Sequence, residues 1–226
     1  MTQQRKGVPS QAAPPHPAFA PGTLVVVGLA SEARLLPPGA RVLVSGADPT
    51  RLARALDSRP AGVERLLSFG LAGGLAPGVA RGALLAAEAV VAAGGIFLPD
   101  PAWTAEIVAR TGALPAVLAG SEALAPDAAV KRALHAATRA LAVDMESGVM
   151  ARAAARHGLP FAVLRAVADR AEESIPRAAA LTPEGRPDLP RVLLGLLRRP
   201  WELPALIRLG RASAAAHAVL RQAASA

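Results

Sequence analysis

Two acidic residues, Glu146 and Asp169, stand just after separate apolar runs in a chain of 226 residues. A parallel sheet presents reactive groups at the carboxyl ends of its strands, so these two carboxylates can open onto one crevice if their strands are neighbours. Carboxyl groups held there could transfer protons to or from a bound molecule. The alternative is a local role, in which Glu146 complements a helix dipole and Asp169 is a cap or turn residue.

The segment around the two acids has the pattern of one helix followed by one strand. Asp144 is typical of a helix N-cap, and apolar residues then recur at helical spacing. Gly158 and Pro160 end that helix, because glycine adopts the left-handed conformation and proline cannot continue a helix. A buried strand is expected from Phe161, with Asp169 at its carboxyl end.

Composition limits the class of protein. Hydrophobic residues make up 52% of the chain and there are no long charge blocks, so the sequence predicts one ordinary domain. The absence of cysteine excludes disulfides, thiolate metal sites and a cysteine nucleophile. The histidines show no metal-ligand spacing, so no metal site is expected; they are His16, His135, His157 and His217.

The positive charge of the chain is almost entirely arginine. A formal net charge of +8 favours an acidic partner, such as a phosphate, a nucleic acid or an anionic membrane surface. Aromatic residues are only 3% of the chain and tyrosine is absent, so the stacking platform of a single-stranded nucleic-acid binder is missing. We therefore expect no nucleic-acid partner.

Strand and helix patterns alternate along the chain and predict an α/β fold, a single domain with a central mixed, largely parallel β-sheet flanked by helices. Residues 1–21 are expected to be a disordered leader, residues 22–186 the α/β domain, and residues 187–226 an arginine- and leucine-rich helical extension. Strands are expected at 23–27, 41–45, 66–69, 84–91, 116–121, 141–143 and 161–167, and helices at 48–58, 104–110, 125–137 and 144–157.

No uncharged apolar run reaches the roughly 20 residues that a membrane-spanning helix needs. We therefore expect a cytoplasmic protein, with membrane association through the extension as a further option.

A glycine-rich stretch, Gly70–Gly74, follows the third expected strand. It matches neither the G-x-G-x-x-G dinucleotide fingerprint nor the P-loop, so nicotinamide and nucleoside triphosphate chemistry are disfavoured. Glycines at a strand end let a ligand approach the backbone and its free amides. The alternative is a tight strand-to-helix turn without a ligand.

Four motifs follow one another in the chain: Gly-x-x-x-Glu at 28–32, Gly-x-Ala-Gly-Gly at 70–74, Val-Asp-Met-Glu at 143–146 and Arg-Ala-x-x-Asp at 165–169. In this order the chain resembles the purine nucleoside phosphorylase and methylthioadenosine/adenosylhomocysteine nucleosidase superfamily, over about residues 23–173. Within it, with support from the tail at 187–220, the chain is most similar to the hopanoid-associated phosphorylases, thought to remove adenine from adenosylhopane.

This resemblance implies an enzyme that cleaves the N-glycosidic bond of a purine nucleoside, with adenosylhopane as the expected substrate. Methylthioadenosine/adenosylhomocysteine-type cleavage and general purine nucleoside phosphorolysis are the alternatives. The resemblance further implies no cofactor, a small-molecule or lipid-linked nucleoside as partner, and a homo-oligomer, with a dimer favoured.

The resemblance also assigns roles to individual residues. Asp169 matches the family's general acid at the departing base, which needs a raised pKa that an apolar strand-end site could provide. Glu146 matches the residue that accepts hydrogen bonds from ribose hydroxyls, and Met145 the residue that packs on the sugar. The pocket of the base and the nucleophile would be formed by Gly70, Leu71, Ala72 and Gly73.

The nucleophile is water or phosphate. Glu32 lies where the nucleosidases of the family carry the acid that activates water, and Leu71 replaces the hydroxyl residue of the phosphorylases. Both features favour hydrolysis, because an anion site without its usual donors binds phosphate poorly. Against this, Arg34 is close enough in sequence to be a phosphate ligand, which keeps phosphate open as a co-substrate. Glu32 could instead be an acid at a helix start.

The aromatic side chain that stacks on the purine in this family is not evident before the Val-Asp-Met-Glu motif. Phe69, Phe97 and Phe161 are better candidates for the core. Base affinity is therefore expected to rest on Asp169 and backbone groups, and adenine preference on the resemblance alone.

The tail carries a basic amphipathic pattern after Trp201. Leu203, Leu206 and Ile207 share one face of an expected helix, while arginines line another. A basic amphipathic helix with an interfacial tryptophan can lie on an anionic membrane. Docking onto the domain itself or onto a partner subunit is the alternative, which we favour slightly.

Two classes of function therefore stand, a purine nucleoside-cleaving enzyme and a catalytically silent nucleoside-binding or membrane-peripheral module. The joint presence of Glu32, Glu146 and Asp169 favours the enzyme.

Overall fold

The computed structural model describes residues 17–58, 61–180, 182 and 185–226. Most of the expected leader, with His16, lies outside the described residues. The strands are β1 Thr23–Val27, β2 Arg41–Val44, β3 Arg65–Gly74, β4 Leu84–Ala92, β5 Gly95–Phe97, β6 Leu114–Gly120, β7 Ala142–Asp144 and β8 Phe161–Asp169. The helices are α1 Ala30–Ala33, α2 Pro49–Ala55, α3 Pro101–Thr111, α4 Ala128–Thr138, α5 Ser147–His157, α6 Leu189–Arg198 and α7 Leu203–Ser225, with 3-10 turns η1 Pro17–Phe19 and η2 Pro200–Glu202.

All of these strands belong to one mixed sheet, in which parallel pairs predominate. Its order is β2-β1-β3-β7-β6-β4-β5, and β8 pairs with both β3 and β4. Because β8 lies parallel to β3 and antiparallel to β4, the strands β3, β7, β6, β4 and β8 pair in a closed circuit. The expected mixed, largely parallel α/β sheet is therefore confirmed.

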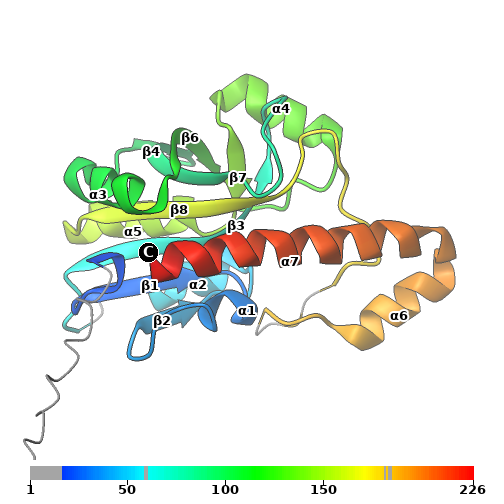
Figure 1. Cartoon of the computed structure of the whole chain (residues 1–226), viewed down its shortest axis with the longest axis horizontal. Coiled ribbons are helices and arrows are strands. Elements are labelled where there is room, and N and C mark those ends of the chain that lie inside the picture. The colour runs from blue at the N-terminus through cyan, green and yellow to red at the C-terminus, as the bar shows by residue number, and fades with distance from the viewer. Residues whose placement is uncertain (1–16, 59–60, 181, 183–184) are drawn as a thin grey trace, which may run out of the picture.

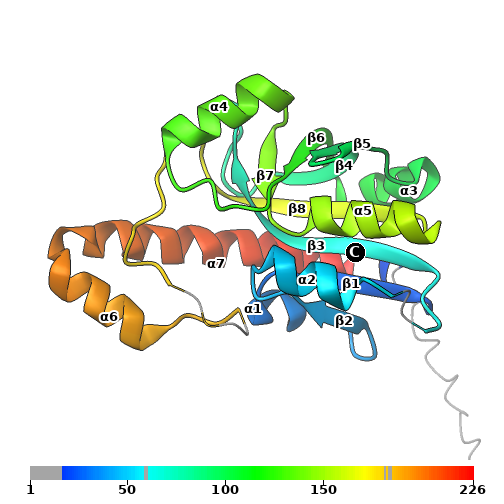
Figure 2. The ribbon, with the colours of Figure 1, turned by 180° about the vertical axis from the view of Figure 1, so that it is seen from behind.

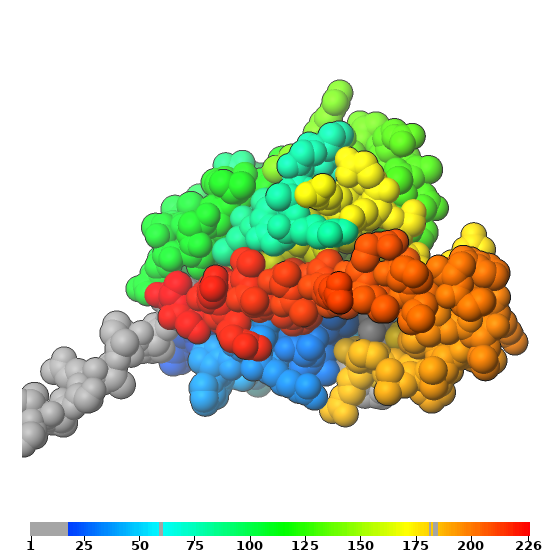
Figure 3. Space-filling model, turned by 45° about the vertical axis from the view of Figure 1, so that its right-hand side comes forward, coloured from blue at the N-terminus to red at the C-terminus, as the bar shows by residue number. Residues whose placement is uncertain are grey.

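Helices cover both faces of the sheet (Figures 1 and 2). Successive residues of a strand point to opposite faces, and β1 shows this clearly. Val25 packs in one core with Leu220 of α7, whereas Val26 packs in the other with Met150 of α5. Figure 3 shows α7, in red and orange, running along one face of the molecule between the blue N-terminal segments and the cyan and green ones.

The glycine stretch at 70–74 is part of a strand, so the expectation of a loop or strand-to-helix turn there was wrong. These residues continue β3 and pair with β8 on one side and β7 on the other. Glycine weakens a strand locally, and its presence in one often marks a place where another group approaches closely.

The helix expected from Asp144 begins three residues later, at Ser147. Asp144 is the last residue of β7, and its carboxylate still accepts from the backbone N–H of Glu146 at 2.9 Å and of Ser147 at 2.6 Å. Asp144 therefore still accepts hydrogen bonds from backbone N–H groups at the start of α5, although it lies in the strand before the helix.

The extension after residue 187 consists of α6, η2 and α7. The second half of α7 packs on the sheet through buried residues such as Ala216 and Leu220, whereas Leu203 and Ile207 in its first half are exposed. None of the residues of α6 is buried. No helix formed by the described residues is both long enough and apolar enough to cross a bilayer.

Candidate functional site

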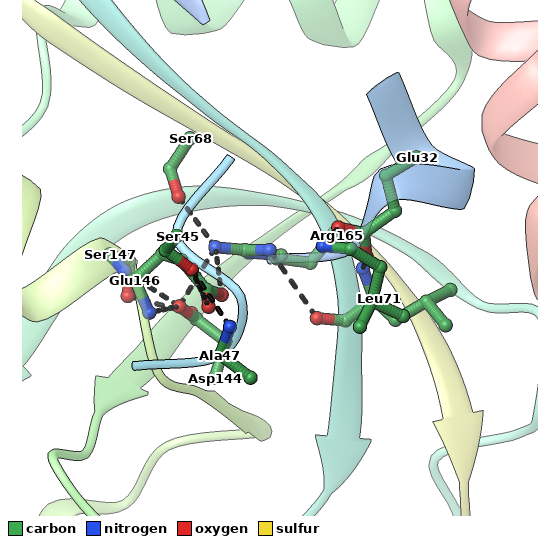
Figure 4. A network of polar contacts seen from close by, with 10 residues as sticks. Glu32, Ser45, Ala47, Ser68, Leu71, Asp144, Glu146, Ser147 and Arg165 are labelled. Atoms are coloured by element: carbon green, nitrogen blue, oxygen red, sulfur yellow. Dashed lines mark hydrogen bonds and ion pairs between the residues drawn. The ribbon is translucent and has the colours of Figure 1, made fainter. Parts of the chain in front are cut away.

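Arg165 is the centre of a buried polar network on β8 (Figure 4). Its Nη2 donates to Asp144 Oδ1 at 2.8 Å, to Ser68 Oγ at 2.5 Å and to Glu146 Oε2 at 3.3 Å. Its Nη1 donates to the carbonyl oxygen of Leu71 at 3.4 Å. The guanidinium thereby joins β3, β7 and the start of α5 at one point below the protein surface.

Glu146 lies in the turn between β7 and α5 and is buried. Besides the contact with Arg165, its Oε1 accepts a hydrogen bond from Ser45 Oγ at 3.0 Å. Burial raises the pKa of Glu146 to about 7, because the lowering effect of Arg165 is smaller and the carboxylates of Asp144 and Glu32 raise the pKa further. This carboxyl group therefore changes its charge near neutral pH.

Glu32 joins the short helix α1 to β3. Its Oε2 accepts from the backbone N–H of Leu29 at 2.7 Å, and its Oε1 accepts from the backbone N–H of Leu71 at 2.8 Å. Burial raises the pKa of this carboxyl group, and the opposing effects of Arg165 and of the backbone N–H groups are smaller. Glu32 is thus an acid at a helix start, which was the alternative interpretation of its sequence position. It is also a member of the buried network.

Asp169 lies at the end of β8 and forms an ion pair with Lys131 of α4. The same ammonium donates to the backbone carbonyl oxygens of Arg170 at 2.8 Å and Glu173 at 2.9 Å. Burial raises the pKa of Asp169, because it outweighs the lowering by the hydrogen bond and charge of Lys131.

Each of the three acids named in the sequence faces a glycine. A Cβ atom added to that glycine would meet a carboxylate oxygen: at Gly28 it would lie 2.8 Å from Glu146 Oε1, at Gly70 2.5 Å from Glu32 Oε1, and at Gly73 3.2 Å from Asp169 Oδ1. The glycines of the first two motifs therefore make room for the acids, which explains why glycines occur inside β3.

The acids are arranged along β3. Glu32 contacts the strand at Leu71, and Asp169 faces it at Gly73. Two residues of a strand span roughly 7 Å. Three carboxylates thus surround the guanidinium of Arg165 and a fourth lies beside Lys131. Burial raises the pKa of Glu32, Glu146 and Asp169, so these three acids hold their protons at higher pH than exposed carboxyl groups do.

A cavity of about 60 Å³ opens beside Asp169, with Lys131, Met145 and Gly73 in its wall. A second cavity, of about 670 Å³, shares Asp169 and Ile175 with the first and reaches α7. Only the second falls within the roughly 300–1,000 Å³ of typical ligand pockets.

The remaining predicted site residues lie apart from the network. Arg34 is exposed at the carboxyl end of α1, where its backbone N–H donates to the carbonyl oxygen of Glu32. Among the described residues, its side chain forms no ion pair with the three acids. Phe69 and Phe161 are buried in the two cores, and Phe97 packs against one of them. The described lining of the smaller cavity includes Ala123 and Leu124 and contains no aromatic residue.

Sequence reasoning missed Lys131 and the role of Arg165. Lys131 is one of two lysines in a chain whose other cations are arginine, and Arg165 is a charged residue inside an otherwise apolar strand. Both features are visible in the sequence. A charged residue is rarely buried unless it is paired, so Arg165 in particular could have been assigned an acidic partner.

Comparison with known proteins shows which family the chain belongs to. Residues 25–182 match the model of the phosphorylase superfamily. A futalosine hydrolase of Streptomyces coelicolor is 37% identical over 185 residues, which cover 65% of this chain and 77% of that protein.

Solved structures of nucleosidases share the fold. A 5'-methylthioadenosine/S-adenosylhomocysteine nucleosidase from Neisseria meningitidis superposes with a TM-score of 0.64 at 15% identity, covering 89% of this chain and 96% of that one. The futalosine hydrolase of Helicobacter pylori gives 0.61 at 16%, covering 90% and 97%. From the family match, the fold and the buried acids together, the chain belongs to the phosphorylase superfamily and is an enzyme of that superfamily.

Proposed function

We propose that this enzyme hydrolyses the N-glycosidic bond of a purine nucleoside. The observation that carries the proposal is the set of three buried carboxylates, Glu32, Glu146 and Asp169, each accommodated by a glycine. Breaking this bond builds positive charge on the ribose and negative charge on the base. A protein that presents carboxyl groups to both parts can therefore stabilise the transition state more than the substrate.

Asp169 is the proposed general acid at the base. Its raised pKa keeps a proton available at higher pH than an exposed aspartate would, and protonation of the departing base removes the charge that opposes bond breaking. Lys131 fixes the position of the carboxyl group from the side of α4.

Glu146 and Met145 are the proposed ribose-binding residues. Glu146 already accepts a hydroxyl hydrogen bond from Ser45, and a ribose hydroxyl offers the same kind of donor. Met145 lies in the wall of the cavity beside Asp169, where it can pack against the sugar.

Glu32 is the proposed base that activates water. Its raised pKa makes the ionised carboxylate a stronger base than that of an exposed glutamate. Two features support water over phosphate as the nucleophile. The side chain of Arg34 is exposed, and the guanidinium of Arg165 already pairs with Asp144 and Glu146.

For the substrate, we propose adenosylhopane, on the resemblance of the four motifs and of the tail to the hopanoid-associated branch. Futalosine is a second candidate, favoured by the 37% identity with the Streptomyces coelicolor futalosine hydrolase. 5'-Methylthioadenosine is a third, because its nucleosidases share the fold.

The test is base release by the full chain from each of these three nucleosides, in buffer with and without phosphate. We expect a free base and a free sugar without phosphate, and at least about a 100-fold loss of rate in Asp169→Asn. The exposed Asp57→Asn is the matched control and should keep the rate. Release that depends strictly on phosphate would replace hydrolysis with phosphorolysis. No release from any of the three nucleosides would rule them out as substrates.

A further inference from the structure

The side of the molecule formed by α6, η2 and the start of α7 exposes large apolar side chains. In Figures 1 and 2 these elements project beyond the sheet and its other helices. We call this the tail surface and define it by Leu189, Leu193, Leu197, Trp201, Leu203 and Ile207, whose exposed fractions run from 47% to 82%. Large apolar side chains exposed together on one projecting segment are typical of an interaction site.

The apolar face of α6 points away from the rest of the protein. A Cβ atom at Gly195 would lie 3.0 Å from Ala178, so the glycine side of the helix is the side that contacts the body. At about 100° per residue, Leu193 and Leu197 both lie about 160° around the helix from Gly195. Packing onto the chain's own domain therefore leaves these leucines uncovered.

The segment that carries this apolar face is positively charged. Residues 187–226 hold six arginines and two acids, a net charge of +4. Both acids are engaged locally: Asp188 caps α6, and Glu202 accepts a hydrogen bond from the backbone N–H of Ala178 at 2.8 Å. Arg191 and Arg198 are both exposed, and by the same helical geometry they lie about 40° and about 60° from Gly195, on the other side of α6 from the leucines.

The start of α7 separates the tail surface from the larger cavity. Leu203 and Ile207 are exposed, whereas Ala205 and Leu209, on the opposite side of the helix, line the cavity of about 670 Å³ that also touches Asp169. One helix thus has a face toward the cavity beside the proposed general acid and a face toward the tail surface.

We propose that the tail surface docks onto an anionic lipid bilayer. The leucines, Ile207 and Trp201 would enter the boundary between headgroups and acyl chains, and the arginines would meet lipid phosphates. A second copy of the chain fits less well, because a symmetric contact through this surface would bring two arginine-rich tails together. A negatively charged bilayer instead complements the charge.

The test is co-sedimentation of the full chain with vesicles, which requires no substrate and is therefore independent of the proposed reaction. We expect binding to vesicles that contain phosphatidylglycerol, weaker binding to phosphatidylcholine alone, and weaker binding at high salt. Trp201 fluorescence should shift to shorter wavelength on binding, because Trp201 is 71% exposed and the other tryptophan, Trp103, is 5% exposed.

Two double variants test whether vesicle binding depends on the leucines of the tail surface or on exposed leucines anywhere on the protein. Leu193→Glu with Leu197→Glu should weaken vesicle binding roughly tenfold or more. The control, Leu98→Glu with Leu114→Glu, alters leucines that are 73% and 59% exposed elsewhere and should bind as the parent does. Thermal unfolding should be the same for both, since no buried group is changed.

Two outcomes would overturn the proposal. The parent chain could fail to sediment with phosphatidylglycerol vesicles, or both double variants could lose binding equally. In the first case, analytical ultracentrifugation could show a dimer that only the Leu193→Glu, Leu197→Glu variant breaks. That result would assign the tail surface to a second copy of the chain.

Discussion

Lys131 and Asp169 form a buried ion pair that joins α4 to the carboxyl end of β8. The lysine also donates to two backbone carbonyl oxygens after the strand, so its position is fixed by three acceptors. It opposes the effect of burial, which raises the pKa of Asp169. The pair therefore sets how tightly the proposed acid holds its proton.

Replacing Lys131 with Met should raise the pKa of Asp169 further, because the lowering charge is lost and the burial stays. The alkaline limb of the pH profile of base release should then move to higher pH. Lys131→Arg keeps the cation and is the control, with a limb near that of the parent. A limb that stays in place in Lys131→Met would contradict the assignment of Asp169 as the acid.

Stability should fall as pH rises from 4.5 to 7, owing to Glu146. Its pKa is raised from 4.5 to about 7 in the folded chain, so the folded state holds this proton more tightly than the unfolded state. The stabilisation is complete below pH 4.5 and is lost as pH passes 7, amounting to about 3 kcal/mol at most. Urea unfolding at a series of pH values measures this slope.

The control for that slope is Glu146→Gln, which cannot ionise and keeps an amide able to accept from Ser45. Its free energy of unfolding should depend less on pH over this interval than that of the parent chain. Parallel curves for the two proteins would assign the slope to other groups.

Gly70→Ala should disrupt the network even though only one methyl group is added. The new Cβ would lie 2.5 Å from Glu32 Oε1 and 2.7 Å from Arg165 Nη1, at a φ of +155°. We expect a loss of stability of about 1–3 kcal/mol in urea unfolding and loss of base release. Gly78→Ala, at a φ of +85° with nothing within 4 Å, isolates the backbone strain and should keep the activity.

Glu32→Gln should slow hydrolysis by about 100-fold or more, because the amide cannot take a proton from water. It retains one acceptor oxygen for two backbone N–H donors, those of Leu29 and Leu71, so a loss of about 1–3 kcal/mol in stability should accompany it. Glu106→Gln, on the exposed side of α3, is the control. A rate of hydrolysis equal to that of the parent would remove Glu32 from the mechanism.

The parts of the fold that local pattern predicts well are strands with clear boundaries. β1 ends before Gly28 and β8 begins after Pro160, and both are runs of buried residues, so apolar pattern and punctuation agree. The acids Glu32 and Glu146 could also be identified from the sequence, because each belongs to a motif. Arg165 pairs with Glu146 and lowers the pKa of Glu32 through its charge, and placing it between them required the pairing of strands to be known.

The residues that were misjudged depend on contacts between distant segments. The glycines at 70–74 indicate a turn when read locally, yet pairing with β8 and β7 holds them in a strand. Lys131 meets an acid 38 residues further along the chain. Neither contact leaves a periodic sign in the sequence, since helical and strand periods describe only which face of one element is buried.

The closed circuit of strands has a consequence for the order of folding. Of the strands given above, β8 comes last in the chain, and it pairs with β3 and β4. Leu66 of β3 therefore cannot pair with Phe161 of β8 until the chain between them has been made. Such distant pairings form slowly, because a long loop is closed before any contact compensates for its lost entropy. Arg165 and Asp169 both lie on β8. During synthesis, Arg165 therefore cannot join Glu146 until β8 has been made, so the strand that closes the circuit also completes the buried polar network.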